Sequence, residues 1–136
     1  MFRRKLEEGL ALFAAGHYFA AHEAWEEAWR QEGGERRALL QGLIQTAAGL
    51  IRAGEGRPRG ARALFTRALG HLVPLLPACE GVTLTLLVQE VQARLEQLAR
   101  GEHAEASPPP LPYAAPPPDT EGVGPAPASP SARSDN

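Results

Sequence analysis

The sequence predicts an all-α protein: a five-helix bundle built from two antiparallel helical hairpins plus a C-terminal helix, followed by a proline-rich tail. Three observations lead to this prediction. Apolar residues recur about every 3.6 residues as far as Arg100, which is the period of amphipathic helices. No segment shows the sustained apolar–polar alternation of a half-buried strand. A pattern of small and aromatic residues also recurs after 40 residues.

The spacing predicts helices over residues 2–14, 18–31, 35–54, 58–73 and 83–100. Glycines mark the gaps between them, at Gly16, Gly33, Gly34, Gly54, Gly56 and Gly81. Pro58 suits the first turn of a helix, where its missing N–H is not needed. Pro74 and Pro77 are expected to end the fourth helix, and Thr83 is expected to cap the fifth.

The 40-residue repeat pairs Gly9 with Gly49, Leu10 with Leu50, Gly16 with Gly56, Ala21 with Ala61, Trp25 with Phe65, and Ala28 with Ala68. Alanines let a neighbouring helix approach closely, and the aromatic ring fills the space between them. The first copy, with Gly16, Tyr18, Ala21, Trp25 and Ala28, resembles the tetratricopeptide repeat. The second copy departs from it at Pro58. Because two copies are too few for a solenoid, we predict one closed bundle.

Composition divides the chain into a bundle domain at residues 1–102 and a tail at 103–136. The tail holds ten prolines and few large apolar residues, so it is expected to be disordered, since such segments bury too little apolar surface to offset their conformational entropy. The bundle should then be equally stable without the tail. If the tail docks on the bundle instead, Tyr113 is the residue expected to hold it.

The charge balance argues against bulk binding to nucleic acid. Residues 1–100 hold thirteen Arg and Lys against eleven Glu, and the rest of the chain holds five acidic residues and one Arg, so neither part carries an extreme charge. No apolar run is long enough for a signal or membrane-spanning segment. We therefore expect a cytoplasmic protein with no membrane association and with nucleic acid as an improbable partner.

Two pairs of polar residues flank the apolar faces of the second and third helices. His22 and Glu26 lie beside the face formed by Tyr18, Ala21, Trp25, Ala28 and Trp29, and Glu23 lies further toward solvent. Gln41 and Gln45 flank the face of the third helix, again four residues apart. If these flanks meet, the four side chains form a semi-buried cluster whose hydrogen bonds fix the helix register.

Three segments of the sequence resemble a known family. The segments YFAAHEAWEEAWR, LLQGLIQTAAGL and RGARALFTRAL are similar to the domain-of-unknown-function 309 family, whose members are small, all-helical and mostly bacterial. The matching positions are Tyr18, Phe19, Ala21, His22, Glu23, Glu26, Trp29, Gln41, Gly42, Ile44, Gln45, Gly60 and Ala61. The resemblance covers roughly residues 10–95, and Ala20 stands where the family usually has an acidic residue. It implies the fold but no particular reaction.

Metal binding and catalysis have weak support in the sequence. His22 and Glu26 could face one ion, but the second His of the zinc-peptidase motif is absent, and no second helix carries the Glu-x-x-His of di-iron bundles. The folded part has no serine, and Cys79 lies in a loop flanked by prolines without a nearby base. We therefore assign no catalytic residue, metal ligand or cofactor.

Arginines form a second candidate surface, at Arg52, Arg57, Arg59, Arg62 and Arg67. Arg57, Arg59 and Arg62 surround the start of the fourth helix, where free N–H groups favour anions. A solvated helix face is the favoured interpretation, because no aromatic residue except Phe65 interleaves with these arginines. The sharper interpretation is a contact with phosphate or an RNA backbone.

The function predicted from the sequence is a non-enzymatic interaction or scaffold module, with a protein partner or self-association. Its candidate pocket is the His22, Glu26, Gln41 and Gln45 cluster, lined by Glu23, Tyr18, Trp25 and Trp29. The alternative is a metal-dependent or acid–base hydrolase-like enzyme centred on His22 and Glu26. A metal analysis of the purified protein would distinguish the two.

Overall fold

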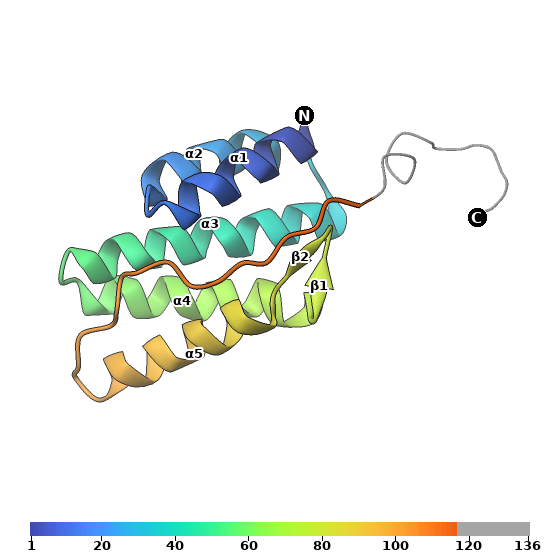
Figure 1. Ribbon diagram of the computed structural model, residues 1–136. Coiled ribbons are helices and arrows are strands. Elements are labelled where there is room, and N and C mark those ends of the chain that lie inside the picture. The colour runs from blue at the N-terminus through green and yellow to red at the C-terminus, as the bar shows by residue number, and fades with distance from the viewer. Residues whose placement is uncertain (117–136) are drawn as a thin grey trace, which may run out of the picture.

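A computed structural model describes residues 1–116, and this part of the chain contains five α-helices and a small two-stranded sheet (Figure 1). The helices are α1 (Phe2–Ala14), α2 (Tyr18–Trp29), α3 (Gly34–Gly54), α4 (Pro58–Leu72) and α5 (Thr85–Ala99). A short 3-10 helix (Val73–Leu75) and strands β1 (Ala78–Cys79) and β2 (Val82–Thr83) connect α4 to α5. None of the described helices combines the length and apolar character needed to cross a membrane.

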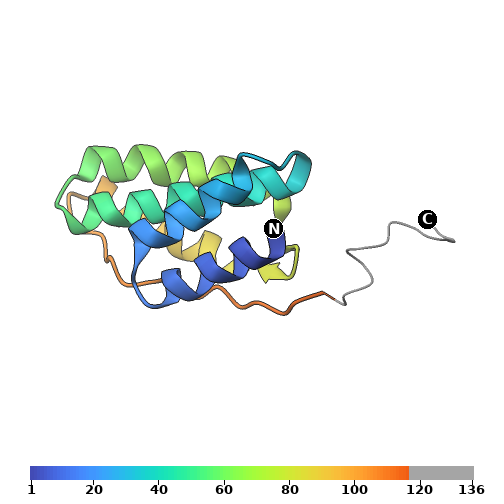
Figure 2. The ribbon, with the colours of Figure 1, turned by 90° about the horizontal axis from the view of Figure 1, so that it is seen from above.

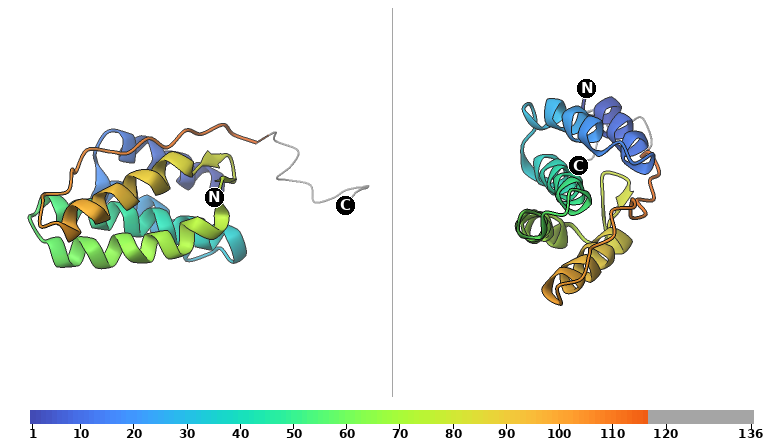
Figure 3. Two further views of the ribbon diagram at one scale, coloured as in Figure 1. Left: turned by 90° about the horizontal axis from the view of Figure 1, so that it is seen from below. Right: turned by 90° about the vertical axis from the view of Figure 1, so that its left-hand side faces the viewer.

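The helices form two antiparallel hairpins, α1–α2 and α3–α4, with α5 packed against α4. Viewed along the helix axes, α3 lies between the α1–α2 pair and α4 (Figure 3, right). The five helices therefore occur at the places expected from their apolar periodicity. Their ends differ from the prediction by one or two residues: α2 stops at Trp29, α3 begins at Gly34, α4 stops at Leu72, and α5 runs from Thr85 to Ala99.

The 40-residue repeat is present in three dimensions. A side chain at Gly9 would meet the Trp25 indole at 2.1 Å, and one at Gly49 would meet the Phe65 ring at 2.6 Å. Each of these glycines thus lets the aromatic ring of the following helix lie against the backbone. The turn that joins the two helices of each hairpin contains a glycine with positive φ, at 82° for Gly16 and 72° for Gly56.

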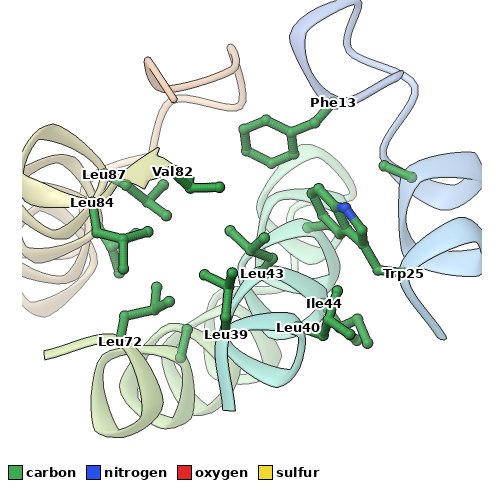
Figure 4. Packing of buried hydrophobic residues seen from close by; sticks show 14 of the residues in the cluster. Phe13, Trp25, Leu39, Leu40, Leu43, Ile44, Leu72, Val82, Leu84 and Leu87 are labelled. Carbon is green, nitrogen blue, oxygen red and sulfur yellow. The ribbon is translucent and has the colours of Figure 1, made fainter. Parts of the chain in front are cut away.

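The core is continuous from the first hairpin to α5. Figure 4 shows Phe13 and Trp25 above Leu43 and Leu40 of α3, with Leu72 of α4 below them. Val82, Leu84 and Leu87 close the opposite side of this cluster, and all three are fully buried. The connection between α4 and α5 therefore contributes directly to the core.

The repeat predicts that Ala61 is as sensitive to added volume as Ala21, since both are fully buried at equivalent positions. We expect Ala61→Leu to lower the free energy of unfolding by about 1–3 kcal/mol because the larger side chain overpacks the core. Urea unfolding measures the change. A variant as stable as the wild type would show that the α3–α4 packing relaxes freely at this position.

The β-hairpin between α4 and α5 corrects the prediction that the fold contains no strands. β1 and β2 pair antiparallel with Cys79 opposite Val82, and their turn is formed by Glu80 and Gly81, with φ values of 53° and 86°. Two residues per strand are too few to give an alternating pattern in the sequence. Thr83 belongs to β2 and does not cap α5, because the residue preceding that helix is Leu84.

Glu80 ties the hairpin to two helices. Its carboxylate forms ion pairs with Arg3 of α1 at 2.7 Å and with Arg36 of α3 at 3.2 Å. The Arg3 guanidinium also donates to the backbone carbonyl of Glu80 at 2.7 Å, and Arg36 lies 4.4 Å above the Phe2 ring. These contacts hold the left-handed residue in place at the edge of the core.

Residues 104–116, here called the return segment, run back along the bundle after α5. Figures 1 and 2 show this segment extended along the helices, and the end-on view in Figure 3 places it between α1 and α5. Its residues Ala104 and Pro109 are buried, and Leu111 and Tyr113 pack against the core. The expectation that the chain from residue 103 contributes no core is therefore wrong for this segment, while residues 117–136 lie outside the described part.

Hydrogen bonds attach the return segment to the bundle. The Arg94 side chain, 3% exposed, donates to the carbonyls of Glu105 at 2.7 Å and Ser107 at 2.9 Å. The Tyr18 hydroxyl donates to the carbonyl of Ala106. Tyr113 pairs with Val82 of β2 as an isolated bridge, and its hydroxyl donates to Glu7 at 2.7 Å. Tyr113 thus has the docking role that the sequence offered as an alternative.

Candidate functional site

The face shared by α2 and α3 carries the polar residues that the sequence singled out, but two of the proposed lining residues lie elsewhere. Trp25 is fully buried, and its indole N–H donates to the carbonyl of Leu6 at 3.3 Å. Tyr18 faces the return segment through its hydroxyl, and burial raises its pKa. Trp25 is therefore a core residue, and the Tyr18 hydroxyl serves docking. Neither belongs to the cluster.

His22 and Glu26 lie on the margin of α2 and are partly exposed. Their nearest atoms, Nδ1 and Oε1, are 3.9 Å apart, beyond hydrogen-bond distance. Glu26 also lies 3.8 Å from Arg30. The ring of Phe19, which is 65% exposed, stacks parallel to the His22 ring with centroids 6.3 Å apart. Glu23 is exposed.

The hydrogen bonds expected between this pair and Gln41 or Gln45 are not formed within residues 1–116. Instead, His22 Nδ1, Trp29 Nε1 and Gln45 Oε1 are buried side-chain atoms without a hydrogen-bond partner there. Native proteins leave few such groups unsatisfied, and each costs about 1–3 kcal/mol. The cluster therefore does not stabilise the bundle in the way that the sequence suggested.

One surface pocket lies at the C-terminal end of α2. It has a volume of about 230 Å³ and is lined by Trp29, Gly34, Arg37, Ala38, Gln41 and His71. Three helices contribute to it, so the pocket spans the groove from α2 across α3 to α4. The Arg37 guanidinium lies 3.9 Å above the Trp29 ring and covers one side. The sequence analysis did not single out Arg37 or His71. His71 shares a pocket with Trp29 only because α4 packs against α3, and Arg37 reaches the Trp29 ring only because α2 and α3 are neighbours.

A second pocket lies at the other end of α2, where the helix begins beside the end of α3. It has a volume of about 490 Å³ and is lined by Gly16, His17, Tyr18, Phe19, Ala20 and Ile51. Phe19 is the most exposed of the large apolar residues in the described chain. His22, Glu26 and Gln45 lie along the helices between the two pockets. The α2–α3 margin is therefore a polar strip with an aromatic residue at each end.

The described residues offer little for metal or nucleophilic chemistry. Among residues 1–116, no three His, Cys, Asp or Glu side chains are grouped so that they could hold a metal ion. The thiol of Cys79 is buried, and burial together with the nearby Glu80 carboxylate raises its pKa to about 11. At neutral pH the group is a thiol, which is a poor nucleophile.

This shift predicts the reactivity of Cys79. The folded protein should react with iodoacetamide far more slowly than the urea-unfolded chain at pH 8, because the thiolate is the reacting species. The rate should rise steadily with pH up to about 11, the pKa of the buried thiol. Mass spectrometry of the alkylated protein follows the reaction. A rate that levels off near pH 8.5, the ordinary range for a free thiol, would contradict the assigned environment.

Arg57, Arg59 and Arg62 come together at a third pocket, of about 330 Å³, between the start of α4 and the end of α5. The walls are completed by Ala53, Gly56, Pro58, Leu98, Gly101, Glu102, His103 and Ala104. The three arginines expected to form an anion contact therefore line one pocket. Its opposite wall comes from Leu98 of α5 and from residues 101–104, which lead into the return segment. Sequence patterns did not place these residues beside the start of α4.

The sequence matches a known family model over part of its length. The family model for a domain of unknown function (DUF309) matches residues 6–64, which span most of α1, all of α2 and α3, and the first half of α4. The match includes the helices that carry His22, Glu26, Gln41 and Gln45. No curated protein matches the chain. This match supports assigning residues 6–64 to the DUF309 family.

Proposed function

We propose that this domain is a non-enzymatic protein-interaction module that binds an extended segment of a partner protein along the α2–α3 margin. The observation that carries the proposal is the set of buried, unpaired polar atoms on this margin: His22 Nδ1, Trp29 Nε1 and Gln45 Oε1. The set contains both a donor and an acceptor, and a peptide backbone offers both in return.

The ends of the margin add apolar anchors. Phe19 at one end is 65% exposed, and Trp29 at the other end lines the groove across α3. Aromatic residues dominate binding energy at protein interfaces. The spacing of one anchor at each end of α2, with polar groups between, suits an extended chain better than a compact small molecule.

The opposite face of the same bundle supports the proposal. There the return segment lies extended on the helices, and side chains of Arg94 and Tyr18 donate to its backbone carbonyls. This scaffold therefore already holds an extended chain through side-chain-to-backbone bonds.

Stability measurements test whether the polar strip serves binding or folding. We expect Gln45→Met to leave the free energy of unfolding unchanged or to raise it by about 1 kcal/mol, because it removes a buried polar atom that has no partner. Gln97→Met is the matched control, since Gln97 Oε1 of α5 is also buried and unpaired but lies outside the α2–α3 margin.

Peptide binding tests the function itself. Peptides selected from a random library against the full chain should bind at least about tenfold more weakly to Gln45→Met and unchanged to Gln97→Met. Equal losses in both variants, or a Gln45→Met protein that is destabilised by more than about 1 kcal/mol with unchanged binding, would argue for a structural role. Stoichiometric zinc, iron or manganese in the purified protein would favour the hydrolase-like alternative, and concentration-dependent dimerisation lost on Phe19→Ser would identify a second copy as the partner.

A further inference from the structure

We propose that the pocket between α4 and α5 binds a small phosphorylated molecule through Arg57, Arg59 and Arg62. This site is separate from the α2–α3 margin and does not depend on the function proposed for it. Its volume of about 330 Å³ is at the lower end of the range typical of small-molecule sites. The three arginines reach it from the last residue before α4 and from the first two turns of that helix.

The described residues leave most of the positive charge of this pocket without a paired carboxylate. Arg59 and Arg62 make no ion pair within residues 1–116. Arg57 Nε lies 3.8 Å from Glu55 Oε1, an oxygen that it shares with Arg52. The Glu55 carboxylate is closer to Arg52, at 3.0 Å. Glu102, the acidic residue in the pocket wall, is bound by the Arg100 side chain through bonds of 2.9 and 3.3 Å. These bonds also lower the pKa of Glu102.

A phosphate group fits this charge distribution better than a carboxylate. Planar guanidinium groups bind phosphate oxygens in bidentate fashion, and a dianionic phosphate can be shared by several arginines. The N-terminal end of α4 adds a smaller favourable term, but the pocket and its unpaired arginines define the site. His103 in the wall is a further hydrogen-bonding group.

The remaining wall determines what else the ligand carries. Ala53, Pro58, Leu98 and Ala104 present apolar surface to the pocket, so a ligand with a compact apolar or aromatic group next to its phosphate buries more surface than inorganic phosphate does. A volume of about 330 Å³ suits one small ligand better than a polynucleotide or a membrane surface. The class of ligand is therefore a soluble phosphomonoester.

Calorimetric titration of the full chain with phenyl phosphate tests the proposal. We expect a dissociation constant below about 1 mM, at least about tenfold weaker binding of inorganic phosphate, and no binding of phenol. Backbone amide signals of the pocket residues should shift in ¹H–¹⁵N spectra. The variant R59Q/R62Q should bind phenyl phosphate at least about tenfold more weakly, and it should fold because both side chains are exposed.

Arg67→Gln is the matched control, since Arg67 is exposed on α4 and does not line the pocket. An equal loss in Arg67→Gln would show a general charge effect and overturn the proposal, as would the absence of phenyl phosphate binding. Single-stranded uridine oligonucleotides and vesicles of phosphatidic acid with phosphatidylcholine provide two further arms. Tighter binding of either than of phenyl phosphate would identify a nucleic acid or a lipid headgroup instead.

Discussion

Truncation of the chain after Glu102 is expected to lower the melting temperature by about 15 °C or more. The truncation removes the return segment and leaves the buried Arg94 guanidinium without its two carbonyl partners, where hydrogen bonds to a charged group each contribute about 1.5–3 kcal/mol. The ion pair of Arg94 with Glu90, at 2.9 Å, remains after the truncation. The truncation also exposes the surface beneath Pro109 and Tyr113. We expect a total loss of about 3–5 kcal/mol, and about 4–8 °C per kcal/mol is usual for a domain this small.

Truncation after Pro116 is the control, because it keeps every contact of the return segment described above. A calorimetric melting curve of each variant gives the comparison. Arg94→Met in the full chain isolates the contribution of the guanidinium and should cost about 2–3 kcal/mol, since the apolar stem is retained. If truncation after Glu102 shifts the melting temperature by less than about 3 °C, the segment contributes little to stability.

Gly9→Ala is expected to reduce the free energy of unfolding by about 2–3 kcal/mol. The added methyl carbon would lie 2.1 Å from Nε1 of the fully buried Trp25, so the indole must move and lose its bond to the Leu6 carbonyl. Gly49→Ala should have a similar effect in the second hairpin, because its methyl carbon would lie 2.6 Å from Phe65.

Gly70→Ala is the matched control for both substitutions. Gly70 also lies within a helix, and a side chain at this position would meet nothing within 4 Å. Alanine there should stabilise the protein by about 1 kcal/mol, since it favours helix without a steric cost. Urea unfolding of the three variants compares them directly. A Gly9→Ala protein that gains stability like Gly70→Ala would show that the indole can move without cost.

Local patterns were sufficient to predict the helices and their repeat. Glycines or prolines lie in each gap between the helices, and the apolar face of a helix is set by a period that depends only on nearby residues. The pairing of Gly9 with Gly49 and of Trp25 with Phe65 followed from the same 40-residue spacing. In each hairpin, the glycine and the aromatic ring that pack against each other are two residues of this repeat.

Long-range contacts explain what the sequence did not reveal. The return segment has the composition of a disordered chain, yet it is held by Arg94 of the preceding helix and by Tyr18, which is 88 residues away from its partner Ala106. Neither residue stands out within its own helix. The β-hairpin depends on Glu80 meeting Arg3 and Arg36. The hydrogen bonds predicted within the polar cluster are not formed, for a different reason. Angular positions on two helices showed that the side chains share a margin, but they could not show whether the side chains meet.

The same difference between local patterns and long-range contacts applies to the candidate sites. The sequence placed His22, Glu26 and Gln45 on one margin, and it grouped the arginines that line the pocket at α4. It did not reveal the walls contributed from elsewhere, namely His71 in one pocket and residues 101–104 in the other. Sites at the junction of distant segments require the tertiary arrangement.

The attachment of Tyr113 to α1 has a consequence for the order of folding. Its hydroxyl meets Glu7 across 106 residues and Arg3 across 110, whereas α1–α2 and α3–α4 pack against sequence neighbours. Contacts of low sequence separation form quickly, and closing a long loop requires more chain entropy. We therefore expect the hairpins to assemble first and the return segment to dock onto a surface that already exists, so that refolding ends with the closure of nearly the whole described chain into a ring.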